Sequence, residues 1–247
     1  MIRTVAIIQA RMGSSRLPGK VLVDIGGATM LAQVVRRLRG ATRIDEIVVA
    51  TSLAGDDDAV ADEALRLGAG VHRGSENDVL GRYLGAARES GAEAIVRVTA
   101  DCPLLDPGVV DLVIEALTDE VDYASNTHDR SFPRGLDSEV LHRDTLERIA
   151  RLGTSRAARE HVTAFVMEQP ALFRIAQVAA EIDDSDLRWT VDTADDLAMV
   201  RGLYAALGLD ASVRPYREVV AAVRARPELA AANAHVRQKS WQVNDVA

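Results

Sequence analysis

The sequence predicts an α/β fold of three layers, in which helices cover both faces of a mostly parallel β-sheet. Short apolar, β-branched runs alternate along the chain with segments of helical periodicity. This alternation is typical of parallel sheets, because each crossover between parallel strands needs a long connection, usually a helix. Aromatic residues make up only 4% of the chain, so we expect a core of Ala, Val, Leu and Ile.

The first half of the chain shows the alternation most clearly. Apolar runs predict strands at 5–8, 47–51 and 94–99, with a further extended segment at 121–125. Amphipathic segments predict helices at 30–38, 59–67, 79–88 and 109–117.

The second half is less regular. A polar stretch with Pro133 and Gly135, residues 126–136, is expected to form a long loop over a site. Strands are predicted at 138–141, 173–178 and 187–191, and helices at 144–152, 157–168 and 194–207. Two more helices follow Pro215, with a polar tail from about Gln238. We expect a main catalytic domain over residues 1–210 and a C-terminal helical extension and tail over 211–247.

The composition excludes several classes of protein. A net charge of −8 and a pI near 5.2 argue against nucleic-acid binding, which needs a positive surface. The single cysteine, Cys102, is expected to be a small buried thiol and forms no internal disulfide. No apolar run is long enough for a signal peptide or a membrane span, so we expect a cytoplasmic protein with no membrane partner.

The segment QARMGSSRLPGK, residues 9–20, is the most informative part of the chain. It follows the first predicted strand, where open α/β sheets place their ligand crevice. Arg11, Arg16 and Lys20 supply three cations within ten residues, and the backbone and hydroxyls of Gly13, Ser14 and Ser15 could wrap a polyphosphate. The pattern favours phosphate binding over the alternative of a solvated basic turn.

Two well-known phosphate motifs do not match this segment. Walker A has four residues between its glycines, whereas five separate Gly13 from Gly19, and Val21 follows Lys20 in place of Ser or Thr. The dinucleotide fingerprint G-x-G-x-x-G is also absent.

Two aspartates are candidates for a metal site. Asp101 and Asp192 each follow a predicted strand, so both are expected at the carboxyl edge of the sheet, where they could hold one Mg²⁺. The alternatives are a turn residue for Asp101 and a helix N-cap for Asp192. The acidic run 56–58 is interpreted as helix capping.

The basic segment also resembles a known family. The pattern R-x-x-S-x-R-L-P-G-K is similar to the signature of sugar-acid cytidylyltransferases of the Kdo type and, more loosely, the sialate type. The longer string AIIQARMGSSRLPGKVL resembles the spore-coat polysaccharide biosynthesis subgroup. Further matches make the resemblance span about residues 3–205; they lie at 72–80, 98–107, 135–140, 160–163 and 187–196. Ala100 departs from the subgroup, which commonly has Gly there.

The resemblance implies a nucleotide-diphospho-sugar transferase fold, which is Rossmann-like, and an Mg²⁺-dependent cytidylyltransferase that moves CMP from CTP to a sugar or sugar-acid acceptor. Pyrophosphate would be released, and the product would serve surface polysaccharide or glycan synthesis. The implied catalytic residues are Arg11, Arg16, Lys20 and Asp101, and the implied metal ligands are Asp101 and Asp192. Nucleotide contacts are implied for Arg11, Gly13, Ser14, Ser15, Arg16, Lys20, Ser75, Asp78 and Arg82. Acceptor contacts are expected from Asn126, Arg134, Asp137 and His161.

Several alternatives stay open on the sequence alone. Asp78 could be a helix cap, and His161 could be a packing residue. A glycosyltransferase of the same fold would normally carry a DxD motif, whereas this chain has Asp101-Cys102-Pro103. A non-catalytic nucleotide-binding partner protein is a further alternative. The acceptor is not identified by the residues, and the resemblance suggests a homodimer.

Overall fold

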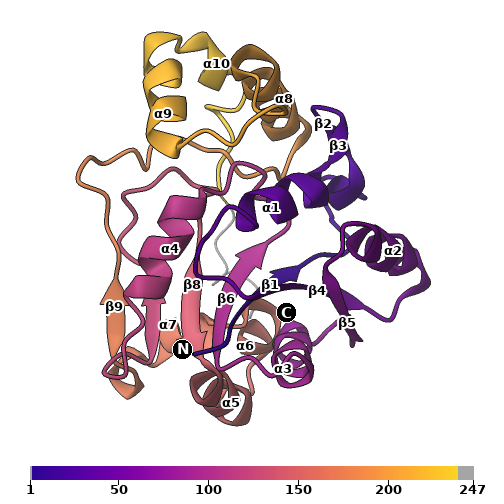
Figure 1. Cartoon of the computed structure of the whole chain (residues 1–247), viewed down its shortest axis with the longest axis vertical. Coiled ribbons are helices and arrows are strands. Elements are labelled where there is room, and N and C mark those ends of the chain that lie inside the picture. Colours follow the sequence, from indigo (N-terminus) through magenta and orange to yellow (C-terminus); the bar gives the residue numbers. More distant parts are fainter. Residues whose placement is uncertain (1, 239–247) are drawn as a thin grey trace.

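The computed structural model describes residues 2–238 and has the three predicted layers (Figure 1). The central sheet has seven strands in the order β5-β4-β1-β6-β8-β7-β9. Their bounds are β1 (Thr4–Gln9), β4 (Glu46–Ser52), β5 (Gly70–Gly74), β6 (Ala94–Thr99), β7 (Tyr123–Ser125), β8 (Glu139–His142) and β9 (Ile175–Gln177). Only β8 runs antiparallel to its neighbours, so the prediction of a mostly parallel sheet is confirmed.

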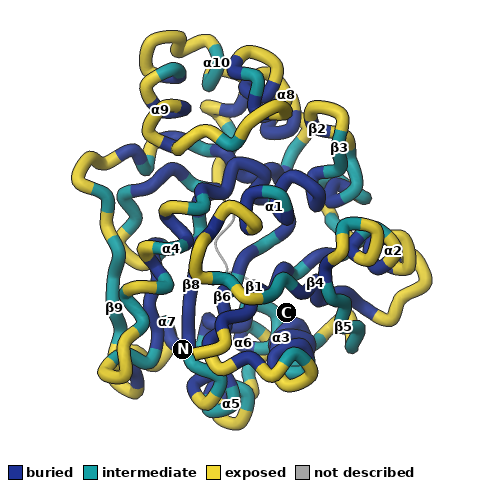
Figure 2. The backbone as a smooth tube through the Cα atoms, viewed as in Figure 1, coloured by how far each residue is buried: buried dark blue, intermediate teal, exposed yellow. Residues whose placement is uncertain are grey.

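Helices cover both faces of this sheet. One face packs against α1 (Met30–Leu38), α2 (Asp58–Arg66) and α4 (Pro107–Glu115). The other packs against α3 (Val79–Glu89), α5 (Arg143–Leu152) and α7 (Ala164–Glu168), and α6 (Arg156–His161) contacts α3 and α7. Successive residues of a strand face opposite sides, so Ala6 and Ile8 of β1 enter one core while Val5 and Ile7 enter the other. This is why the central strands are apolar on both faces and buried throughout (Figure 2).

The C-terminal helices form a third hydrophobic cluster. These are α8 (Ala194–Leu207), α9 (Tyr216–Ala225) and α10 (Glu228–Ala231), at the top of Figure 1, and β6 and β9 point towards them. Trp189 and Phe132 are buried in this cluster together with side chains from α8 and α9. The expected division at residue 210 therefore stays a prediction, since one core lies on both sides of it. No helix within residues 2–238 has the length and apolar character needed to cross a membrane.

Some short elements were not predicted. The edge strand β5 has the sequence GVHRG, whose two glycines and partly exposed side chains hide the usual strand pattern. A small hairpin, β2 (Asp24–Ile25) and β3 (Ala28–Thr29), precedes α1. Three 3-10 turns complete the elements, at η1 (Lys20–Leu22), η2 (Gly55–Asp57) and η3 (Pro170–Leu172).

Two predicted elements differ from the structure. The single helix expected at 157–168 is broken into α6 and α7 at Val162, whose φ of 51° no helix accommodates. The strand expected at 187–191 is wrong, because within the described residues this segment makes only an isolated bridge between Arg188 and Arg134. Apolar alternation alone does not reveal whether a partner strand is available.

The strand order creates a crevice at one position. From β1 the chain moves outward to β4 and β5, then returns to place β6 on the other side of β1. Ligands of open α/β sheets bind at the carboxyl ends of the strands where the order reverses in this way. Gln9 and Thr99, the last residues of β1 and β6, are partners in register, so the segments that follow them leave the sheet side by side.

Candidate active site

Lys20 lies at the centre of this crevice. Its Nζ donates to Asp101 Oδ2 at 2.8 Å, to Asp192 Oδ1 at 2.9 Å and to the carbonyl oxygen of Val191 at 2.8 Å. Burial alone would lower the pKa of Lys20, but attraction by the two carboxylates outweighs it and raises the pKa above its ordinary value. The ammonium is therefore charged, and it holds together two aspartates that are 91 positions apart (192 − 101).

Asp101 is held from several sides. Thr99 Oγ1 donates to its Oδ1 at 2.5 Å, and its backbone oxygen accepts from Val191 N at 2.8 Å. Burial would raise the pKa of Asp101, but the Lys20 ammonium and the Thr99 hydroxyl stabilise the carboxylate and lower it. Asp101 is thus ionised at neutral pH, as a metal ligand or an electrostatic catalyst needs to be.

Asp192 is surrounded by cations. Besides Lys20, Arg16 approaches its Oδ2 at 3.0 Å and Arg188 approaches the same oxygen at 2.9 Å. The N-cap of α8 is Thr193, which forms a capping box with Asp196. The alternative of Asp192 as an N-cap is therefore wrong, and its side chain is turned to the crevice instead.

The candidate phosphate loop, residues 11–20, is anchored by a residue that we interpreted from the sequence as helix capping. Met12 N donates to Asp57 Oδ1 at 2.6 Å, and Ser52 N donates to Asp57 Oδ2 at 3.2 Å. Asp57 occupies the N-cap position of α2, as the sequence indicated, but its side chain makes no capping hydrogen bond. The carboxylate instead ties the loop to the end of β4.

The 75–78 turn lies beside the same loop, where Arg11 reaches Glu76 at 3.9 Å. Asp78 accepts from Gly81 N at 2.9 Å and caps α3, which is the alternative considered for it. Buried Arg82 donates to the carbonyls of Ser75 and Glu76 at 2.5 and 3.0 Å. These side chains shape the turn, and their direct contact with a nucleotide stays a prediction.

The long polar loop is closed on itself. Asn126 Nδ2 donates to Leu136 O at 2.8 Å, and Asn126 Oδ1 accepts from Ser138 N at 2.9 Å. Asp137 pairs with Arg130 through contacts of 2.5 and 2.9 Å. Asn126 thus has a structural role in this loop, and its contact with an acceptor stays a prediction.

Gly135 allows the same loop to approach the 187–190 segment. Its φ is +110°, and a Cβ there would lie 2.6 Å from Thr190 N. The approach lets the backbone oxygen of Arg134 accept from Trp189 N at 2.6 Å and from Thr190 N at 3.1 Å. The loop and the segment that carries Asp192 are therefore joined by backbone hydrogen bonds and lie together at one side of the crevice.

His161 lies at the end of α6, just before the break at Val162. Burial lowers the pKa of His161, so its imidazole is neutral at physiological pH. Thr163, two residues further on, donates to Glu139 Oε1 at 2.6 Å. Glu139 also pairs with Arg97 and accepts from Tyr123, so a buried polar network supports the turn that carries His161.

Two residues of the candidate site were not singled out from the sequence, whereas the interpretation of Cys102 as a buried thiol is confirmed. Thr99 and Arg188 hold Asp101 and Asp192, yet a lone hydroxyl or arginine beside a motif carries no distinctive signal. Cys102 is buried, and burial raises the pKa of its thiol well above the ordinary value, so it is not a nucleophile.

The two aspartates fit a small divalent cation. Within residues 2–238 no group of three or more His, Cys, Asp or Glu side chains could form a closed metal cage. Mg²⁺ needs no such cage, because one or two carboxylates suffice when water and phosphate oxygens supply the remaining ligands. Asp101 and Asp192 meet that requirement, since both carboxylates approach the same point at Lys20 Nζ.

A cationic loop at the reversal point of a parallel sheet, facing the carboxylates of Asp101 and Asp192, is the arrangement expected of a nucleotidyltransferase. A family model described as cytidylyltransferase matches residues 5–199. The chain belongs to the cytidylyltransferase family. This family membership favours the predicted enzyme over the glycosyltransferase and non-catalytic alternatives.

Known proteins support this assignment over most of the chain. The spore coat polysaccharide biosynthesis protein SpsF of Bacillus subtilis is 35% identical over 210 residues, which cover 82% of this chain and 86% of SpsF. The solved structure of a cytidylyltransferase from Leptospira borgpetersenii is 30% identical and superposes with a TM-score of 0.90, covering 97% of this chain and 100% of that one. A CTP complex of CMP:2-keto-3-deoxy-manno-octonic acid synthetase is 22% identical, has a TM-score of 0.63 and covers 83% and 99% of the two chains, which supports the fold.

Proposed function

We propose that this enzyme transfers CMP from CTP to a sugar or sugar-acid acceptor and releases pyrophosphate, in the synthesis of a surface polysaccharide or another glycan. The observation that carries the proposal is the convergence of Lys20, Asp101 and Asp192 at the end of β1 and β6. The family membership and the relationship to a spore coat polysaccharide protein support the cytidylyl group and the biosynthetic role.

The nucleotide side of the site works by charge. The triphosphate would lie along residues 11–20, which follow β1, and would contact the backbone and hydroxyls of Gly13, Ser14 and Ser15. Arg11, Arg16 and Lys20 would hold the β- and γ-phosphates and stabilise the charge that develops on the departing pyrophosphate. These cations are fixed before substrate arrives, because Arg16 and Lys20 already pair with carboxylates of the site.

Asp101 and Asp192 would hold the divalent cation, which we propose to be Mg²⁺. When bound, this ion would neutralise charge on the α-phosphate. Lys20 pairs with both carboxylates and Arg16 with that of Asp192, while Thr99 and Arg188 fix the orientation of each. The acceptor hydroxyl would attack the α-phosphorus in line with the bond to the leaving pyrophosphate.

The acceptor would enter over β6, β8 and the 126–138 loop. Arg134, Asp137 and neutral His161 would contact its polar groups, with Asn126 either joining them or only shaping the loop. We further propose a cytoplasmic location, where CTP is available, and a homodimer by analogy with the family.

A nucleotide screen tests the proposal. Purified chain with Mg²⁺ and each of CTP, UTP, ATP and GTP is combined with a panel of sugar acids, amino sugars and phosphonates, and pyrophosphate release is measured. We expect pyrophosphate release with CTP and at least one acceptor. We expect this release to be lost when the divalent ion is left out. Equal melting-temperature shifts with all four nucleotides, and no CTP-dependent release, would contradict it.

A further inference from the structure

A cavity of about 390 Å³ lies between the 126–138 loop, the 185–188 segment and the C-terminal helices α9 and α10. Its lining includes four arginines, at 134, 188, 224 and 237, but one carboxylate, at 186. Much of the rest is apolar or amide in character, with Val223, Ala230 and Asn233 among it. The lining thus holds more arginines than carboxylates, in a chain whose overall charge is −8.

Two of these arginines are already neutralised. Arg188 pairs with Asp192 at 2.9 Å and with Asp196 at 2.8 Å. Arg224 pairs with Asp184 at 2.9 Å and with Asp186 at 2.6 Å.

The other two arginines, Arg134 and Arg237, have no carboxylate partner among residues 2–238. Arg237 is exposed, whereas Arg134 is only partly accessible. The backbone bridge between Arg134 and Arg188 sets two arginines side by side. Burial, together with the nearby positive charge of Arg130, lowers the pKa of Arg134, although Asp137 opposes the shift. A partly buried guanidinium among other arginines has lost hydration without gaining an ion pair, which an anion would correct.

We propose that this cavity is an oxyanion site, in which Arg134 and Arg237 bind a carboxylate or phosphate group of a small molecule. None of residues 9–20, where the triphosphate would bind, lines this cavity. The Arg188 guanidinium connects the two sites, because it lines the cavity and donates a hydrogen bond to Asp192. Two sources share this chemistry, an anionic group carried by the acceptor and a free anion that binds on its own. The inference does not depend on CTP being the nucleotide.

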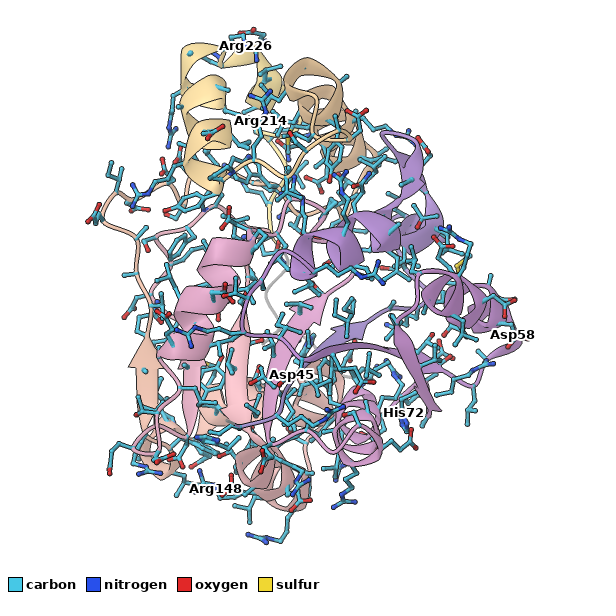
Figure 3. The ribbon with its side chains drawn as sticks, in the orientation of Figure 1. Asp45, Asp58, His72, Arg148, Arg214 and Arg226 are labelled. Carbon is cyan, nitrogen blue, oxygen red and sulfur yellow. The ribbon has the colours of Figure 1, made fainter. Side chains whose placement is uncertain are left out.

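Selenate is a suitable probe, and its effect is measured against sodium chloride of equal ionic strength, with CTP and Mg²⁺ present to fill the triphosphate loop. In the wild-type chain, selenate is expected to raise the melting temperature by about 2–4 °C. Arg134→Gln should remove most of that shift and Arg237→Gln a smaller part. Arg214→Gln is the matched control, because Arg214 is an exposed arginine next to α9 that does not line the cavity (Figure 3).

Four further measurements make the outcome decisive. Arg134→Lys keeps the charge and should restore part of the shift, and the CTP-induced shift in each variant reports that the fold is intact. A full selenate shift in Arg134→Gln, or none in the wild-type chain, would overturn the proposal. Glucuronate compared with acetate, and glucose 6-phosphate compared with inorganic phosphate, distinguish an anion carried by a sugar from a free one. A selenate shift that depends on Arg134 while CTP produces neither shift nor turnover would reject the proposed function and leave this site standing.

Discussion

The two sides of the crevice are built in different ways. The nucleotide side comes from one continuous segment, residues 9–20, which leaves β1 and returns to the crevice at Lys20 within a single loop. The acceptor side is assembled from the 126–138 loop, the 185–192 segment, the turn after α6 and the C-terminal helices. The first side comes from one stretch of the sequence, whereas the second brings together separate segments, as the bridge between Arg134 and Arg188 shows.

This difference explains how each side withstands substitution. Residues 11–20 are tied to the end of β4 by the bond from Met12 N to Asp57, and the Arg16 and Lys20 side chains pair with the carboxylates of the crevice. Polar side chains of the acceptor side are engaged with each other and with buried backbone, as Asn126 and Glu139 are. We therefore expect changes on the nucleotide side to affect activity before stability, and changes on the acceptor side to affect both.

The largest effect is expected where the two sides meet. Asp101→Asn and Asp192→Asn keep the size of the side chain but remove the charge, so each should lower turnover by about 10³-fold or more. Because both carboxylates serve one point in the crevice, the double variant should lose little beyond either single one. The turnover of each variant is measured as pyrophosphate release. Near-normal turnover of Asp192→Asn, or multiplicative losses, would show that the two aspartates act separately.

Lys20→Met should combine both kinds of effect, because Lys20 serves the phosphate loop and is also buried. Its removal leaves two carboxylates without their shared cation, so stability should fall by about 1–3 kcal/mol and CTP affinity by about tenfold or more. Arg16→Gln, at the rim, should weaken CTP binding with a stability change within about 0.5 kcal/mol. Urea unfolding measures the stability of each variant and CTP titration measures its CTP affinity, with Arg214→Gln as a neutral control. If Lys20→Met and Arg16→Gln destabilised the protein equally, the buried Lys20 and Arg16 at the rim would not differ in their contribution to stability.

On the acceptor side we expect a loss of stability without a loss of CTP binding. Asn126→Ala removes bonds to buried backbone at Leu136 and Ser138 and should cost about 1–3 kcal/mol of stability. The melting-temperature shift produced by CTP should be unchanged, since the phosphate loop is not touched. Ser15→Ala, an exposed change in that loop, is the matched comparison and should alter stability by at most about 0.5 kcal/mol. If Asn126→Ala leaves stability intact, the two sides do not differ as described.

The acid dependence of stability gives the finest test. The pKa of Asp196 is lowered because its ion pair with Arg188 and its hydrogen bond from Asn233 outweigh the effect of burial, which alone would raise it. A carboxyl group with a folded-state pKa below its unfolded value, about 3.9, contributes stability above that pH. The contribution is lost as the pH falls through the folded-state pKa. Urea midpoints between pH 6 and 3 should therefore decline less in Asp196→Asn than in the wild-type chain, and parallel declines would contradict this assignment.

The sequence was most informative where structure is local. Apolar runs and helical periodicity identify β1, β4, β6 and most helices, and the cations of residues 11–20 stand out because they are close together. Asp101 could be placed in advance because it follows β6 at the carboxyl edge of the sheet. Asp192 was paired with it on the expectation of a strand at 187–191 that the structure lacks, and the two carboxylates instead meet at Lys20. The sequence did not predict the antiparallel direction of β8, the break at Val162 or the absence of a strand at 187–191. Each of these depends on contacts with segments that are distant in the sequence. Arg188 and Asp57 were missed for the same reason, since each acts through a contact that spacing does not reveal.

Asn233 ties the C-terminal extension to Arg188, which in turn pairs with Asp192. Its Nδ2 donates to Asp196 Oδ1 at 2.9 Å and to the backbone oxygen of Arg188 at 3.0 Å, while Arg188 also donates to Gln238 Oε1 at 2.6 Å. Sub-global opening of the segment after α9, of the kind that amide hydrogen exchange detects, would therefore loosen Arg188 and with it Asp192. The part of the chain that matches the family ends at residue 199, so a chain trimmed to that boundary would keep every motif and still lose the brace behind its second aspartate.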